Sequence, residues 1–161
     1  MKNFILLISF LLTTLSFAQS RSFEIIDLDN QKTTVTAADL SKYSKQTIDS
    51  LQITNHLKEY RSTLKNVKGV LLRDVLSKVS FKEKSPKVLS EYYIVCVAED
   101  GYKVVFSWNE IFNTSVGDSV IIIPEIEGRP KDGISTLSPT DFATGRRYVK
   151  MLKTIQLKKI D

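Results

Sequence analysis

The segment Tyr92–Ala98 constrains the fold most, because Tyr-Tyr-Ile-Val-Cys-Val-Ala is apolar throughout. A strand that is apolar on both alternating faces is typical of the interior of a sheet that is covered on both sides. Asp100-Gly101 separates this segment from Lys103–Phe106, and Asp-Gly between apolar runs indicates a hairpin, since glycine accepts positive φ. The sequence therefore predicts a central β-hairpin, with Cys96 pointing into the core.

Further strands are indicated by β-branched and aromatic residues between turn signals. They are predicted at Phe23–Asp27, Lys32–Thr36, Ile48–Ile53, Ser119–Ile123 and Tyr148–Lys158. The first two should form a hairpin around Asp29-Asn30, a natural turn pair. Pro124 is expected to stop the fourth strand, and Gly128, Pro130 and Gly133 to mark an irregular loop.

Three short helices are predicted between the strands. Thr36 caps the first, apolar residues at i, i+3, i+4 and i+7 from Leu72 indicate the second, and Ser107 with Glu110 forms a capping box for the third. The expected fold class is α/β (α+β), a mixed β-sheet with short helices.

The first 18 residues have the three-part pattern of a secretory signal peptide. Lys2 precedes an apolar run from Phe4 to Phe17, and Ser-Phe-Ala18 stands ahead of Gln19. That run is shorter than the roughly 20 residues that cross a bilayer. We expect cleavage after Ala18, export to the periplasm or the exterior, no membrane span after cleavage, and a single domain over residues 19–161.

Charge and composition limit the kinds of partner, crosslink and metal site that are expected. The net charge of +5 arises from Lys and Arg that are spread among acids, which favours neither nucleic acid nor an anionic membrane. Cys96 is the only cysteine, so no internal disulfide can form. His56 is the only histidine, so a protein-built metal site is not expected.

Four segments follow one another in a characteristic order: Val67–Leu76, Ala98–Tyr102, Ile126–Pro130 and Gly145–Leu152. Together they resemble the oxidoreductase molybdopterin-binding domain family of the sulfite-oxidase type. Members of that family carry a Gly-Val-x-Leu helix start, an Asp-Gly-Tyr hairpin, a Gly-x-Pro loop and a Gly-x-Arg-x-Val-Lys strand in this order. The resemblance covers about Ile53 to Ile160 and implies a sulfite-oxidase-like, mixed α/β fold.

Two departures from the family pattern bear on function. Catalytic members carry a molybdenum-ligating cysteine upstream of the first segment, whereas no cysteine precedes Gly69 here and Cys96 follows it in a buried strand. The chain is also much shorter than a catalytic domain of the family. The resemblance thus implies a short member in which cysteine ligation of molybdenum is not expected, while molybdopterin is left open as a cofactor.

The resemblance also implies candidate ligand-binding residues. Arg147 and Lys150 match basic residues near the anionic end of the pterin, and Arg146 and Thr144 are further donors. Arg129 is the candidate from the Gly-x-Pro loop. Guanidinium and ammonium groups bind phosphate well; the alternative is that these residues form a solvated strand end. No catalytic residue and no metal ligand is assigned.

Two functions remain as hypotheses, and whether the protein is an enzyme stays open. The first is an exported, non-catalytic binding module for a small anionic ligand or an exported protein partner. The alternative is a molybdopterin-dependent oxidoreductase or a subunit of one, and copurified molybdenum would distinguish the two. A nucleic-acid partner is not expected, because no basic stripe with interleaved aromatic residues is present.

Overall fold

The computed structural model describes residues 21–79 and 81–160, and the predicted signal peptide lies outside this part of the chain. Nine strands and five short helical elements are described there, as follows. The strands are β1 (Ser22–Ile26), β2 (Lys32–Thr36), β3 (Lys45–Thr54), β4 (Tyr60–Leu71), β5 (Tyr92–Ala98), β6 (Lys103–Ser107), β7 (Ile121–Ile126), β8 (Arg129–Leu137) and β9 (Leu152–Lys159). The helices are α2 (Ala37–Leu40), α3 (Leu72–Leu76), α4 (Pro86–Leu89), α5 (Trp108–Phe112) and the 3₁₀ helix η2 (Thr144–Arg147).

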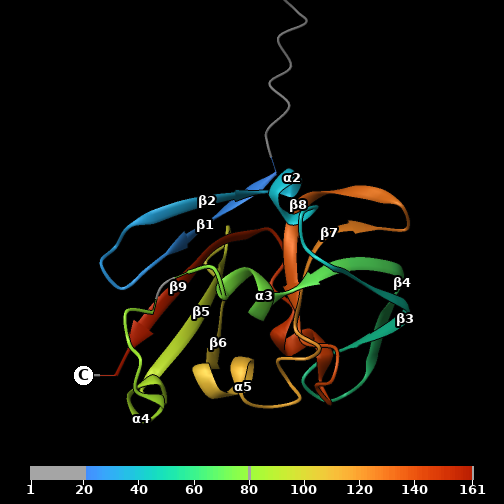
Figure 1. The fold of residues 1–161 in the computed structure, drawn as a ribbon. Helices are drawn as coiled ribbons and strands as arrows, with labels where there is room; N and C mark the ends of the chain where they lie inside the picture. The colour runs from blue at the N-terminus through green and yellow to red at the C-terminus, as the bar shows by residue number, and fades with distance from the viewer. Residues whose placement is uncertain (1–20, 80, 161) are drawn as a thin grey trace, which may run out of the picture.

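The strands form two sheets, and the fold is mixed α+β as the sequence predicts (Figure 1). The five-stranded sheet has the order β2-β1-β9-β5-β6, and the four-stranded sheet the order β3-β4-β7-β8. The five-stranded sheet is mixed because β1 runs parallel to β9, while its other neighbouring strands are antiparallel. The sequence predicts one mixed sheet, whereas the strands of the structure form two separate sheets.

The predicted hairpin of β5 and β6 is confirmed. The two strands pair in antiparallel register, Gly101 has a φ of +86°, and the Asp100 side chain accepts a hydrogen bond from the amide of Tyr102. Cys96 is fully buried on the inner face of β5, whereas Val95 on the other face is only half-buried. Burial on both faces is therefore less complete than the sequence predicts.

Strand β7 lies between two hydrophobic clusters and contributes side chains to both. Ile122 belongs to the larger cluster, which contains the inner face of the five-stranded sheet. Ile121 and Ile123 point the other way, into a smaller cluster with Val67 and Tyr148. Because both faces of β7 are buried, the two clusters share one structural element.

Two predictions around Pro124 are wrong. β7 continues through Pro124 to Ile126, with a shift in its register to β8 between Ile123 and Glu125. A proline has no amide hydrogen for the ladder, and such irregularities accommodate it. The predicted irregular loop is a hairpin, because Glu127 and Gly128 have φ values of 54° and 70° and form a two-residue turn before β8.

The last strand also starts later than predicted. Tyr148–Lys150 lies before β9, and Val149 exchanges two backbone hydrogen bonds with Thr136 of β8, of 2.8 and 2.9 Å. Met151 then takes a φ of 51°, and a register shift opposite Val97 and Ala98 interrupts the alternation. The chain thus passes from one sheet to the other at this point, and Met151 is 38% exposed.

The predicted helix caps are confirmed at Thr36 and Ser107, each of which forms a reciprocal capping box with the residue three positions on. The helix from Leu72 ends at Leu76 and is shorter than its apolar spacing suggests. Within residues 21–79 and 81–160, no helix has the length and apolar character to cross a membrane.

Substitutions on the two faces of β7 test whether the clusters form one cooperative core. Ile122→Ala and Ile123→Ala should each lower the free energy of unfolding by about 2–5 kcal/mol, because each leaves a cavity in a buried cluster. Urea denaturation followed by circular dichroism and by Trp108 fluorescence should give one coincident transition for both variants. Val105→Ala, at a 53% exposed position of β6, is the control and should change stability little. Separate transitions for the two probes would contradict a shared core.

Candidate functional site

A hollow lined by cations lies where the end of β3, the start of β4 and the residues around η2 meet. Arg61, Arg146 and Lys150 line it together with His56, and its volume is about 370 Å³. We call it the cationic groove. None of the described residues that line it is an aspartate or a glutamate. Arg61 pairs with Glu59, which lies outside the lining, at 3.6 Å, so the excess positive charge of the hollow comes from Arg146 and Lys150, and it favours anions.

Hydrogen bonds hold η2 against the end of β3. The Thr144 hydroxyl donates to the carbonyl of Gln52 at 2.8 Å and accepts from the amide of Thr54 at 3.0 Å. The Thr144 amide donates to the Thr54 hydroxyl at 3.2 Å. Any Cβ at Gly145 would overlap the Thr54 carbonyl oxygen, so this close approach requires glycine. The backbone that carries the groove cations is thereby fixed.

Tyr102, on the turn between β5 and β6, braces the same segment from the other sheet. Its hydroxyl donates to the backbone carbonyl of Arg146, and its ring borders the groove. The Arg146 side chain is left exposed, and neither Arg146 nor Lys150 forms an ion pair within the part of the chain that the structure describes. Both cations are therefore available to an anion.

Arg147 is oriented differently from its neighbours and does not line the groove. Its Nε donates to Asp141 at 2.6 Å, its Nη1 donates to Glu110 at 2.8 Å, and its guanidinium lies 4.6 Å from the centre of the Phe106 ring. Burial alone would raise the pKa of Asp141, but the hydrogen bonds from Arg147 and Ser138 outweigh it and lower that pKa. Arg147 therefore links the segment before η2 to the start of α5.

The structure brings together two of the five residues that the sequence singled out. Arg146 and Lys150 share the groove, whereas Arg129 is exposed at the start of β8, where its backbone pairs with Ile126, and it does not line the groove. Arg61 was not predicted. It lies 85 positions before Arg146, and nothing local in the sequence indicates their proximity.

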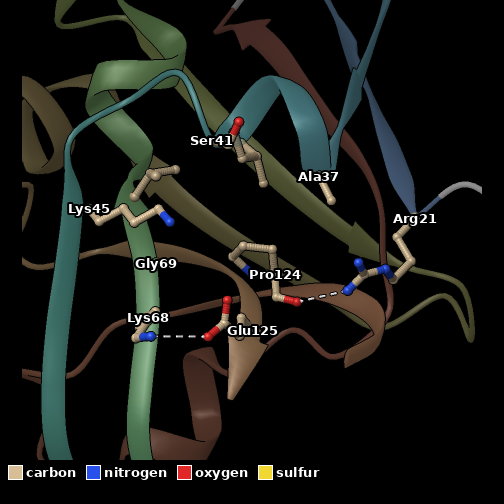
Figure 2. Close-up of a pocket in the computed structure, with 10 residues that line it drawn as sticks. Arg21, Ala37, Ser41, Lys45, Lys68, Gly69, Pro124 and Glu125 are labelled. Atoms are coloured by element: carbon tan, nitrogen blue, oxygen red, sulfur yellow. Dashed lines mark hydrogen bonds and ion pairs between the residues drawn. The ribbon is translucent and has the colours of Figure 1, made fainter. Parts of the chain in front are cut away.

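A second, more enclosed cavity of about 130 Å³ lies between α2, β4 and β7 (Figure 2). Its cations are largely engaged: Lys68 pairs with Glu125 at 3.3 Å, and Arg21 donates to the Pro124 carbonyl at 3.1 Å. The cavity lies at the irregular pairing of β4 with β7, near Gly69. Because an acid and a carbonyl already occupy its donors, this cavity is a weaker candidate for an anion site than the cationic groove.

The residues present do not fit a molybdenum centre with a cysteine ligand. A cysteine ligates a metal as its thiolate, and the only cysteine, Cys96, is fully buried, which raises the pKa of its thiol to about 12. Among the described residues, no group of three or more His, Cys, Asp and Glu side chains could hold a metal ion. A phosphate group of a pterin would find cations in the groove, but no thiolate faces it.

The fold can be compared with those of known proteins. No protein-family model matches the chain, and no curated protein matches it. Among solved structures, a chain in the crystal structure of the sulfane dehydrogenase SoxCD from Paracoccus pantotrophus is similar, with a TM-score of 0.62 and 13% sequence identity over 87% of this chain. The match spans 39% of that longer chain. At this identity the likeness shows the fold alone, and it supports the sulfite-oxidase-like fold that the sequence implies.

Arg147→Ala should lower the free energy of unfolding by about 1–3 kcal/mol, because it leaves the half-buried Asp141 carboxylate without its charged donor. Thermal or urea denaturation measures the change. Arg129→Ala removes an exposed arginine and should leave stability within about 0.5 kcal/mol of the wild type. Equal stability of the two variants would contradict the linking role of Arg147.

The same interaction gives a pH dependence with a defined sign. Because the folded-state pKa of Asp141 is lowered, its stabilising contribution is present above the ordinary aspartate value of 3.8 and is lost as the pH falls through the lower folded value. The stability difference between wild type and Asp141→Asn should therefore shrink in strong acid. A difference that grows on acidification would have the wrong sign.

Cys96 should not react with iodoacetamide at neutral pH in the folded protein, because its thiol is buried and protonated. Mass spectrometry should show alkylation only after denaturation. Rapid modification of the native protein would show that the thiol reaches solvent and would reopen its role as a metal ligand.

Proposed function

We propose that the protein is an exported, non-catalytic binding module that takes a small anionic ligand in the cationic groove. The observation that carries this proposal is the convergence of Arg61, Arg146 and Lys150 on one hollow whose described lining has no acidic side chain. Guanidinium groups bind oxyanions through paired donors, and ammonium groups bind them as compact charges. Phosphate-like groups are therefore the chemistry that the groove favours.

The way the groove is built supports binding without large rearrangement. Thr144, Tyr102 and Arg147 brace the segment that carries Arg146 and Lys150. Binding to a pre-formed site avoids the entropy cost of ordering a loop. Since the groove is open to solvent, binding should weaken as the salt concentration rises.

The groove offers little of the machinery that hydrolysis or group transfer requires. His56 has no carboxylate beside it in the described lining to orient its imidazole, and Cys96 lies elsewhere in the core. Nucleophilic catalysis needs an activated nucleophile and an oriented base. This composition supports ligand binding rather than turnover.

The fold likeness to a chain of the sulfane dehydrogenase SoxCD favours one second candidate, a molybdopterin-dependent oxidoreductase or a subunit of one. In that case the groove would hold the phosphate of the pterin, and the metal would require a ligand other than Cys96. Molybdenum that copurifies with the protein in near-stoichiometric amount would favour this candidate over the binding module.

Isothermal titration calorimetry with pyrophosphate tests the proposed function. The wild type should bind it saturably, and Arg146→Ala and Lys150→Ala should each weaken binding by about ten-fold, since each removes one charge-assisted interaction. Arg129→Ala is the matched control, because it removes an arginine that lies outside the groove, and it should bind as the wild type does.

Two results would contradict the proposal. One is the absence of saturable binding by the folded wild type at low salt. The other is an equal loss of affinity in Arg129→Ala and Arg146→Ala, which would indicate a general effect of charge and no defined site.

A further inference from the structure

Exposed apolar side chains occur on two loops that adjoin the cationic groove. Leu57, on the turn between β3 and β4, is 64% exposed, Tyr60 at the start of β4 is 61% exposed, and Phe142, between β8 and η2, is 88% exposed. Elsewhere among the described residues, Ile160 is 64% exposed and Val105 is 53% exposed. Lys58 Nζ lies 5.3 Å from the centre of the Phe142 ring, so the two loops are neighbours.

Both loops are ordered by hydrogen bonds. The Asn55 side-chain oxygen accepts from the amides of Leu57 at 2.9 Å and Glu59 at 3.0 Å, and Lys58 takes a φ of 64°. Asp141, next to Phe142, is held by Arg147 and by the Ser138 hydroxyl, which donates to it at 2.7 Å. The turns thus present Leu57 and Phe142 to solvent in a defined arrangement.

The surrounding charge is mostly positive. Lys58 and Arg61 lie on the hairpin itself, and Arg146 and Lys150 lie in the adjoining groove. The two nearby acids are engaged, because Glu59 pairs with Arg61 at 3.6 Å and Asp141 with Arg147. Lys58, Arg146 and Lys150 form no ion pair among the described residues, so the apolar side chains that project from these ordered turns are flanked by three cations without an acidic partner.

We propose that this end of the molecule, the apolar tip formed by Leu57, Tyr60 and Phe142, docks on an anionic phospholipid surface. Phenylalanine, tyrosine and leucine side chains favour the interface between headgroups and acyl chains, and neighbouring lysines and arginines are attracted to anionic headgroups. Exposed apolar patches mark membrane or protein contacts. Single side chains projecting from turns suit insertion between lipids, whereas a stable protein interface requires a broad complementary face. The inference does not rest on the proposed binding of a small anion.

Vesicle co-sedimentation tests this docking surface. The full chain should sediment with phosphatidylcholine vesicles that contain phosphatidylglycerol and much less with phosphatidylcholine alone. Phe142→Ala and Leu57→Ala should each reduce partitioning at least about five-fold, because each removes an inserted apolar side chain. Ile160→Ala is the matched control, since Ile160 has the same exposed fraction as Leu57, and it should partition as the wild type does.

A fluorescent label gives a second measurement, which reports whether one chosen position enters the lipid. Cys96 is buried and should not react, so a polarity-sensitive dye can be attached selectively to the cysteine of Phe142→Cys or Ile160→Cys. Vesicles with phosphatidylglycerol should shift the emission of the dye at position 142 to shorter wavelength and leave the dye at position 160 unchanged.

The outcomes separate this inference from the proposed function. Phe142→Ala should keep wild-type affinity for pyrophosphate in the absence of lipid, because Phe142 does not line the groove. Equal sedimentation of the wild type with neutral and anionic vesicles, no sedimentation with either, or equal behaviour of Leu57→Ala and Ile160→Ala would overturn the docking surface. The absence of sedimentation with either kind of vesicle would direct attention to a protein partner for the tip.

Discussion

Arg147 connects parts of the molecule that belong to both sheets. Its guanidinium edge binds Asp141 in the segment after β8 and Glu110 on α5, and its face lies over Phe106 of β6. A planar guanidinium can make these contacts together because its hydrogen-bond donors lie in the plane and its face remains free for an aromatic ring. One short segment therefore contains the half-buried Arg147, the groove cations Arg146 and Lys150 on either side of it, and the exposed Phe142 that precedes it.

Local sequence patterns correctly predicted the elements that are stabilised by residues close together in the sequence. The hairpin after Ala98 and the capping boxes at Thr36 and Ser107 depend on residues a few positions apart, and all three are present. The prediction at Pro124 was wrong because residues that are distant in the sequence make a proline tolerable in this strand. A register irregularity accommodates the missing amide hydrogen, and Arg21 donates to the proline carbonyl. Neither compensation can be recognised within a short window of sequence.

The candidate site was predictable only in part. The family resemblance pointed to Lys150, with Arg146 as a further donor, and the structure brings the two together in one groove. It also pointed to Arg147, whose orientation depends on acids that are distant or unremarkable in the sequence. Arg61 joins the groove only because β3 and β4 form a long hairpin that ends beside η2. Basic residues that are far apart in the sequence are therefore close together in the folded protein.

Backbone amide chemical shifts, followed by nuclear magnetic resonance during titration with pyrophosphate, test the location of the anion most directly. Binding in the cationic groove predicts saturable shifts centred on Asn55, Arg61 and Arg146. Shifts centred instead on Lys45 and Gly69, which line the cavity of Figure 2, or shifts that never saturate, would contradict the assignment of the groove as the binding site.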